Sequence, residues 1–472
     1  MRTTAPQFSF ADLEFLTQGV KLEPALKAIA DFLAQHGDMV QLVQRDLQLG
    51  LKKPSTGRAG LTAQQVLRSL ILMRVKNWDY RELRERIADG YTLRHFAQFN
   101  SQRVPQHDAF HRAFNRLTPE TLQGVNEAVI RAAVRLGLED GAKLRVDTTV
   151  VETNIHHPTD NTLLWDSVRV LTRLVGKLNR ILPKGVGMFT NRTRAAKRRM
   201  LEIQRMASRE RPRQQLGKYR ALIGITEQVI AQARAVVQRS ASCGDLNLIS
   251  QSAVEALRRD IMRHCELGAR IVSQATRRLF QGEQVPAEEK LYSIFETHTD
   301  LIKRGKALKP LEFGHKVFLA ESGQGLITQY QVLNGNPADQ IHVQPSLERH
   351  QAIFEYAPHL FSSDRGFYNE KNIESCQAAG VILPCIPFCG GGRSAEVQSF
   401  ENSPSFKQGQ RFRAGIEGRI SVLFRGRGMK RALVEGRQHF ELLVGAAVLA
   451  NNLLVIAKLL RCKAARSHRR VA

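Results

Sequence analysis

One aspartate stands inside a segment whose composition predicts a β-strand. Residues 143–151 (KLRVDTTVV) are rich in β-branched side chains, and Asp147 lies in the middle of this segment. An aspartate is unfavourable there for both strand propensity and burial, which makes Asp147 a candidate functional residue. A solvated edge strand is the alternative explanation. Glu152 lies five residues further on, so a regular strand places it on the opposite face, and the two carboxylates are not expected to share a site.

A second carboxylate follows another predicted strand. The segment 359–364 (HLFSSD) ends at Asp364, which begins the glycine-containing turn 364–368 (DRGFY). In α/β folds, ligand-binding residues lie at the carboxyl ends of strands. A helix N-cap or a turn is the commonplace alternative for such an aspartate.

A third candidate acid lies in an arginine-rich segment. Glu417 is found in 411–427 (RFRAGIEGRISVLFRGR), where an ion-paired surface glutamate is the alternative explanation. Spacing alone does not choose between Glu417 and three other glutamates, Glu401, Glu435 and Glu441. Carboxylates brought together from separate elements suit magnesium. Two such ions, about 3.5–4 Å apart, activate the attacking oxygen and stabilise the leaving oxygen in phosphoryl transfer.

The elements around these acids alternate between strand and helix. Three further strands are predicted at 312–320, 326–333 and 381–386, and the glycine-containing stretch 321–325 (ESGQG) predicts a hairpin turn between the first two. Residues 369–379 predict a helix. We therefore expect a mixed α/β domain formed by 141–157 together with 290–440.

The first 140 residues predict a helical domain. Thr62 and Gln65 have the spacing of a capping box, and Thr118 followed by Pro119 supplies an N-cap with proline at the first helical position. Short helices joined by short turns are compatible with a helix-turn-helix DNA reader, and equally with a small helical bundle. We expect a DNA-binding or dimerisation domain here.

A long stretch of helix formers, 158–289, separates the two parts of the α/β domain. Nine cations gather in its basic run: Arg192, Arg194, Lys197, Arg198, Arg199, Arg205, Arg209, Arg211 and Arg213. Such a run is usually a solvated helix face. Because acids are sparse around it, we expect the run to lack partners for salt bridges within the helix, and we favour an arm that binds phosphates.

The overall charge points to a polyanionic partner. The 472 residues carry a net charge of +26, and the pI is near 10.3. Nucleic acid and anionic membrane surfaces are the usual polyanions for so basic a chain. The six cysteines are too few and scattered for a disulfide framework. Cys385 and Cys389, near Cys376, lack a fourth partner for zinc, so reduced thiols are the simpler account.

The two ends of the chain give no sign of export. The first thirteen residues contain one arginine and no apolar stretch of the kind found in secretory signals, so we expect a cytoplasmic protein. Within the C-terminal segment 441–472, the apolar stretch 442–460 is interrupted by Asn451, Asn452 and Lys458. A buried core helix is expected rather than a membrane span. The basic tail 461–470 is expected to be disordered.

Several blocks, taken in order, resemble bacterial insertion-sequence transposases of the ISNCY-like group, in the DDE superfamily. The resemblance spans most of the chain. Its blocks are 57–96, 144–164 (LRVDTTVVETNIHHPTDNTLL), 293–317 (SIFETHTDLIKRGKALKPLEFGHKV), 335–339 (GNPAD), 363–372 (SDRGFYNEKN), 413–423 (RAGIEGRISVL) and 449–454 (LANNLL).

This resemblance implies an RNase H-like catalytic core, a mixed sheet flanked by helices, with a DDE triad. Matched by position, Asp147, Asp364 and Glu417 are the three acids and hold two Mg²⁺ ions, for which Mn²⁺ can substitute. Arg413, four residues before Glu417, resembles the arginine of the family signature. Gln410 stands where that signature has tyrosine, and Phe424 where related groups often have lysine.

The implied activity is metal-dependent cleavage of double-stranded DNA at the element ends, followed by strand transfer into target DNA. We expect Arg413 and Arg419, together with Arg192, Arg194, Lys197, Arg198 and Arg199, to contact DNA phosphates. A homodimer or higher oligomer, associated with the bacterial nucleoid, is expected because two element ends must be paired, and no membrane partner is expected. The alternatives are a catalytically inactive DNA-binding relative and a nuclease that cuts without joining.

Overall fold

The computed structural model describes residues 2–7, 9–17, 19, 21–57, 59–182, 189–206, 212–241, 247–303 and 311–471. These residues form two compact units. Unit 1 combines Met1–Thr153 with Gly314–Ala472, and unit 2 is Asn154–Phe313. Of the residues singled out above, Arg209 and Arg211 of the basic run and residues 304–310 of the block 293–317 lie outside the described ranges.

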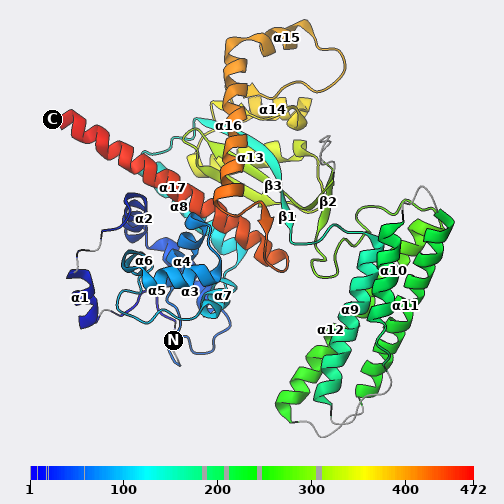
Figure 1. The fold of residues 1–472 in the computed structure, drawn as a ribbon. Helices are drawn as coiled ribbons and strands as arrows, with labels where there is room; N and C mark the ends of the chain where they lie inside the picture. Colours follow the sequence, from blue (N-terminus) through cyan, green and yellow to red (C-terminus); the bar gives the residue numbers. More distant parts are fainter. Residues whose placement is uncertain are drawn as a thin grey trace. The chain divides into compact units, whose positions relative to one another are not determined.

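A mixed sheet of seven strands carries the fold (Figure 1). Its strands are β1 (Lys143–Thr153), β2 (Asp300–Lys303), β3 (Leu311–Ser322), β4 (Ile327–Val332), β5 (Leu360–Ser362), β6 (Leu383–Cys385) and β7 (Arg431–Ala432). The order is β2-β3-β1-β5-β6, with β4 also on β3 and β7 also on β1. β1 is antiparallel to β3 and parallel to β5, and β6 continues the parallel side.

The five strands expected from the sequence are confirmed as β1, β3, β4, β5 and β6. β3 and β4 form the expected antiparallel hairpin, in which Gly325 takes a positive φ of 89° that suits glycine. Two short strands, β2 and β7, were not expected. With helices on both faces of the sheet, the fold is α/β.

Alternation along β1 gives the sheet two different faces. Leu144 and Val146 share a core with Phe318 and with the side chains of α13 (Val343–Phe354) and α14 (Glu370–Ala378). The opposite face is covered by α16 (Pro404–Gly426) and by the first part of α17 (Arg437–Val471). Asp147 is one residue beyond Val146, so the pleat directs it to the face of α16.

The N-terminal region is helical, as expected, and packs within unit 1. Its helices are α1 (Phe10–Thr17), α2 (Pro24–Gln35), α3 (Asp38–Gln48), α4 (Ala63–Lys76), α5 (Tyr80–Asp89), α6 (Tyr91–Phe96), α7 (His107–Phe114) and α8 (Pro119–Arg135). The predicted capping box is confirmed, because Thr62 and Gln65 exchange both hydrogen bonds at the start of α4. Thr118 caps α8, with Pro119 at its first position.

The long apolar helix α17 packs against the N-terminal helices. Within the described residues, one stretch, Arg437–Arg466, is long and apolar enough to cross a membrane, and 78% of its most apolar window is buried inside the protein. Its neighbours are α2, α4, α8 and β4, and Leu449, Leu453 and Ile456 belong to their common core. This packing is that of a core helix. The basic tail, expected to be disordered, instead continues α17 to Val471.

Unit 2 is mainly a bundle of helices that lie side by side (Figure 1). Its helices are α9 (Asp160–Ile181), α10 (Thr193–Arg205), α11 (Pro212–Ser240) and α12 (Leu248–Phe280). Leu171, Val229, Ile261 and Ile271 are among the fully buried members of its core. The insertion expected at 158–289 falls inside this unit.

Three further short helices belong to unit 1. They are α15 (Ala395–Asn402), η1 (Asp339–His342) and η2 (Arg365–Phe367).

Candidate active site

Three carboxylates from three elements surround one guanidinium group. Arg413 Nη2 lies 3.2 Å from Asp147 Oδ2 and 3.6 Å from Asp364 Oδ2. Arg413 Nη1 lies 3.0 Å from Glu417 Oε1. The sequence places these acids 217 and 53 residues apart along the chain, and the fold brings them to a single cation. The other glutamates considered for the third position are elsewhere.

The pairing of β1 with β5 explains why the two aspartates meet. These neighbouring strands are parallel, and Arg145 is in register with Ser362. Two residues further along each chain come Asp147 and Asp364, so both lie at the same level of the sheet. Asp364 is just past the end of β5 and caps η2, where its Oδ1 accepts a hydrogen bond from Gly366 N at 2.9 Å. Its other oxygen remains for Arg413.

Helix α16 supplies the third acid, and it is held close to the sheet. A Cβ on Gly409 would lie 2.9 Å from Cys385 Cβ and closer still to the sulfur, so only glycine permits this approach. Ser362 Oγ donates to Gly409 O at 2.9 Å. Gln410 Nε2 donates to Ser363 O at 3.2 Å and to Cys385 O at 2.8 Å. Gln410, which departs from the family signature, therefore fixes the helix one turn before Arg413.

The three acids differ strongly in their access to solvent. The side chain of Asp147 is 10% exposed, that of Asp364 is 40% exposed, and that of Glu417 is 67% exposed. Arg413, at 18%, is mostly covered. Asp147 Oδ1 also accepts from Thr148 N at 2.7 Å. The site is thus anchored at the buried end by Asp147 and open to a large substrate at the end of Glu417.

The donor set suits a hard cation, although its oxygens now face a guanidinium. Within the described ranges, no group of three or more His, Cys, Asp or Glu side chains stands close enough to hold a metal ion as they lie. Carboxylate oxygens are the donors that magnesium prefers. Asp147, Asp364 and Glu417 already converge on one positive charge. These three acids are therefore the residues that could hold a metal ion, provided that Arg413 moved away from them.

A fourth acid, not singled out in the sequence, lies beside Asp364. Asp339 Oδ1 accepts from Thr148 Oγ1 at 2.9 Å and lies 2.8 Å from Lys316 Nζ. Its Oδ2 is 3.4 Å from the place where Gly366 would carry a Cβ, and Asp364 Oδ1 is 3.0 Å from that same point. Asp339 ends the block 335–339 (GNPAD), so the resemblance marked the segment without giving the residue a role.

A buried ion network fixes the strands beneath the site. Glu321 is fully buried and lies 2.7 Å from Arg145 Nη2, on the cross-strand neighbour, and 2.8 Å from Arg419 Nε. Arg419 also donates to Asn451 at 3.2 Å. The structure thus engages Arg419, expected to contact DNA, in contacts inside the protein. Sequence spacing gave no sign of this network, because Glu321 and Arg419 are 98 residues apart.

The cations of the basic run are partly paired. Glu202 lies 2.7 Å from Arg199, 2.9 Å from Lys218 and 4.0 Å from Arg198. The expectation that the run lacks partners within its own helix is therefore wrong for two of its arginines, because one glutamate at i+3 and i+4 serves both. Arg194 and Lys197 are exposed and make no ion pair with the described residues, while Arg192 is half-buried at the start of α10.

Burial accounts for the chemistry of the central cysteines. Cys376, Cys385 and Cys389 are free. Burial raises the pKa of both Cys376 and Cys385 to about 12, which keeps these thiols protonated at neutral pH. Cys389, in contrast, is exposed.

Comparisons of this chain with protein-family models, with curated proteins and with solved structures found no match.

Proposed function

We propose that this chain is a DDE transposase of the bacterial insertion-sequence kind, with an RNase H-like catalytic core. The observation that supports it most directly is the convergence of Asp147, Asp364 and Glu417 on Arg413. The mixed sheet flanked by helices is compatible with such a core.

The proposed chemistry is phosphoryl transfer on double-stranded DNA. Asp147 and Asp364 would share two Mg²⁺ ions, with Mn²⁺ as a substitute, and Glu417 would complete the coordination of the second ion. When bound, the ions activate the attacking oxygen and stabilise the leaving one. Water first forms a bond to phosphorus and the 3′ oxygen leaves as a hydroxyl at the element end. That hydroxyl then attacks a target phosphate, which releases a target 3′-hydroxyl.

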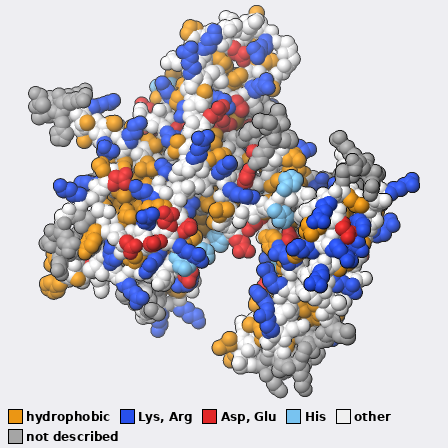
Figure 2. Space-filling view, in the orientation of Figure 1, with side chains coloured by type: hydrophobic (Ala, Val, Ile, Leu, Met, Phe, Trp, Pro, Cys, Tyr) orange, Lys and Arg blue, Asp and Glu red, His pale blue; other side chains and the backbone are white. Residues whose placement is uncertain are grey.

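The chain's own residues have two further tasks in this proposal. Arg413, once the carboxylates turn to metal, becomes free to pair with a phosphate beside the scissile bond. Unit 2 offers a second surface: residues 158–289 contain 24 Lys and Arg against 12 Asp and Glu, a net charge of +12. Figure 2 shows Lys and Arg side chains spread over the visible face of its helices. Such a surface suits non-specific duplex binding by counterion release.

The proposal includes the setting of the reaction. Two element ends must be held together, so a homodimer or higher oligomer on DNA is proposed, in the bacterial cytoplasm at the nucleoid. No membrane partner is proposed, in keeping with the buried apolar helix α17.

The test is cleavage of a DNA fragment that carries the ends flanking this gene. Wild type, Asp364→Asn and a matched control, Glu396→Gln on exposed α15, are compared with magnesium. We expect wild type and the control to cut and to join the freed end to a target, and Asp364→Asn to bind DNA normally without cutting. Cutting by Asp364→Asn would overturn the site.

Two other outcomes would replace the proposed activity. If wild type binds the ends but cuts with neither magnesium nor manganese, the chain is an inactive DNA-binding relative. If wild type cuts but never joins, it is a metal-dependent nuclease. A strand-transfer product that needs Asp364 is the result that supports transposition.

A further inference from the structure

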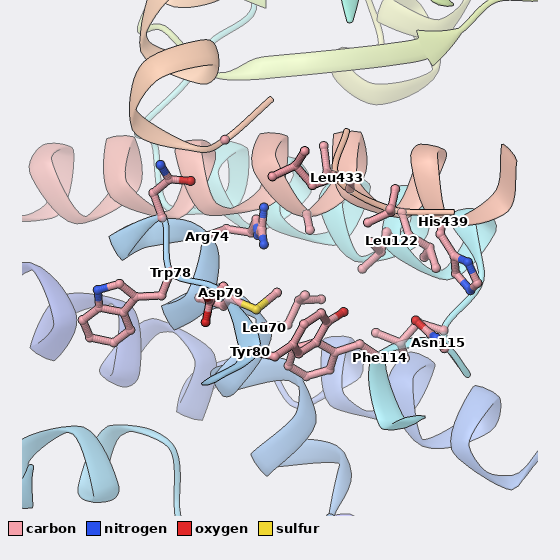
Figure 3. Close-up of a pocket in the computed structure, with 18 of the residues that line it drawn as sticks. Leu70, Arg74, Trp78, Asp79, Tyr80, Phe114, Asn115, Leu122, Leu433 and His439 are labelled. Atoms are coloured by element: carbon pink, nitrogen blue, oxygen red, sulfur yellow. The ribbon is translucent and has the colours of Figure 1, made fainter. Parts of the chain in front are cut away.

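Unit 1 contains an apolar cavity whose lining includes none of the three candidate acids. Its volume is about 500 Å³, within the range of roughly 300–1,000 Å³ found for ligand sites. Helices α4, α8 and α17 and the segment 424–434 contribute its wall (Figure 3). Aliphatic side chains make up much of this wall, among them Leu70, Met73, Leu122, Leu433, Leu442 and Leu443.

One unpaired cation stands in this apolar wall. Arg74, in the last turn of α4, reaches into the hollow between Leu70 and Leu433 (Figure 3). Among the described residues, none accepts a hydrogen bond from its guanidinium and no carboxylate pairs with it. Burial lowers the pKa of Arg74, although the neighbouring Tyr80 opposes this effect. An arginine stays charged even so, and a half-buried charge without a partner is less favourably solvated than one in water.

The other charged groups at the cavity do not neutralise Arg74. Asp79 is the one carboxylate among the lining residues, and its Oδ1 is already used by the backbone N–H groups of Arg81 and Glu82, each at 2.8 Å. Lys430 and Arg431 are also in the lining and add positive charge. The cavity therefore combines an apolar body with an excess of positive charge at its wall.

We propose that this cavity binds a small amphipathic carboxylate, with its apolar chain against the leucines and its carboxylate paired with Arg74. A single unpaired guanidinium matches a single carboxylate in charge, and the two planar groups can form a bidentate pair of hydrogen bonds. Binding of a small polar anion is disfavoured, because it would leave the leucines of the wall in contact with water. This inference does not depend on the proposed activity.

The experiment measures binding of decanoate and of decanol to the full chain by calorimetry. The two probes have the same alkyl chain and differ only in the head group, a carboxylate or a hydroxyl. The ratio of their affinities therefore reports the contribution of Arg74. Hydrogen bonds to charged groups are worth enough to give a preference of about tenfold or more for decanoate. We expect that preference in wild type and in the control Arg81→Met, whose exposed arginine is not in the lining.

Two variants distinguish recognition of the carboxylate from burial of the alkyl chain. Arg74→Met should still bind decanol but lose the preference for decanoate. It should melt no lower than wild type, because it removes a half-buried charge that has no partner. Leu122→Trp, which fills the cavity, should weaken both probes at least tenfold. The proposal is overturned if wild type binds neither probe, if it binds both equally, or if Arg74→Met keeps the preference.

Discussion

The buried ion network beneath the site predicts a large loss of stability from one isosteric change. Glu321→Gln removes the negative charge that lies between Arg145 and Arg419 and keeps the side-chain volume. Glu321 is fully buried, and the two arginines are only 12% and 22% exposed. Breaking a buried pair by removing one partner costs about 3–5 kcal/mol. Because both arginines keep some contact with water, we expect the lower end, about 3 kcal/mol.

The assay is urea unfolding of unit 1, monitored by tryptophan fluorescence. The chain has two tryptophans, Trp78 in unit 1 and Trp165 in unit 2, so a Trp165→Phe background leaves one reporter for unit 1. The matched control is Glu127→Gln, which breaks an exposed pair with Arg131 and should cost less than about 1 kcal/mol. A loss below about 1 kcal/mol for Glu321→Gln, with an unchanged urea slope, would refute the reasoning.

Two further predictions concern the helix that carries Glu417 and the pH dependence of unit 2. Gly409→Ala places a methyl group against Cys385 and should destabilise unit 1 by about 1–3 kcal/mol in the same assay; an unchanged midpoint would mean that α16 can move away. The hydrogen bond to Asp166 raises the pKa of His156, so this pair stabilises the fold below the unfolded histidine pKa of about 6.5, and the effect is lost as pH rises through the higher folded value. In a Trp78→Phe background, Trp165 reports the unfolding of unit 2, and its urea midpoint should be higher at pH 6 than at pH 8.5. The further change His156→Gln should remove that difference. An equal pH response with and without His156→Gln would exclude the His156–Asp166 pair as its cause.

Local chemistry was enough to predict several elements. The segment 143–151 has the β-branched residues of a strand, and Thr62 with Gln65 marks the start of α4 by a reciprocal pair of hydrogen bonds that depends on four consecutive residues. Asp147 was identified as a candidate because an acid is unfavourable inside a strand. Asp364 was identified because ligand-binding residues lie at the carboxyl ends of strands in α/β folds.

The remaining features depend on contacts between distant segments. Helix α16 was not predicted from the sequence. It contains four glycines, each unfavourable in a helix interior. Its packing on the sheet outweighs that propensity, and Gly409 is required for the close approach. The meeting of Asp147 with Asp364, and the pairing of Glu321 with Arg145, follow from strand register, which no local pattern encodes. The contacts of Arg413 with the two aspartates, and of Arg419 with Glu321, follow from the packing of α16 on the sheet.

The place at which unit 2 joins the sheet has a consequence for how the chain folds. Glu152 and Gly314 are cross-strand neighbours, yet the 160 residues of Asn154–Phe313 lie between them. Closing an open loop of that length costs conformational entropy that grows with the logarithm of its length. If the bundle folds first, however, its two ends are already tied, and β1 meets β3 almost as the arms of a short hairpin. The order of events, bundle before sheet, would then determine how quickly Asp147 reaches its partners.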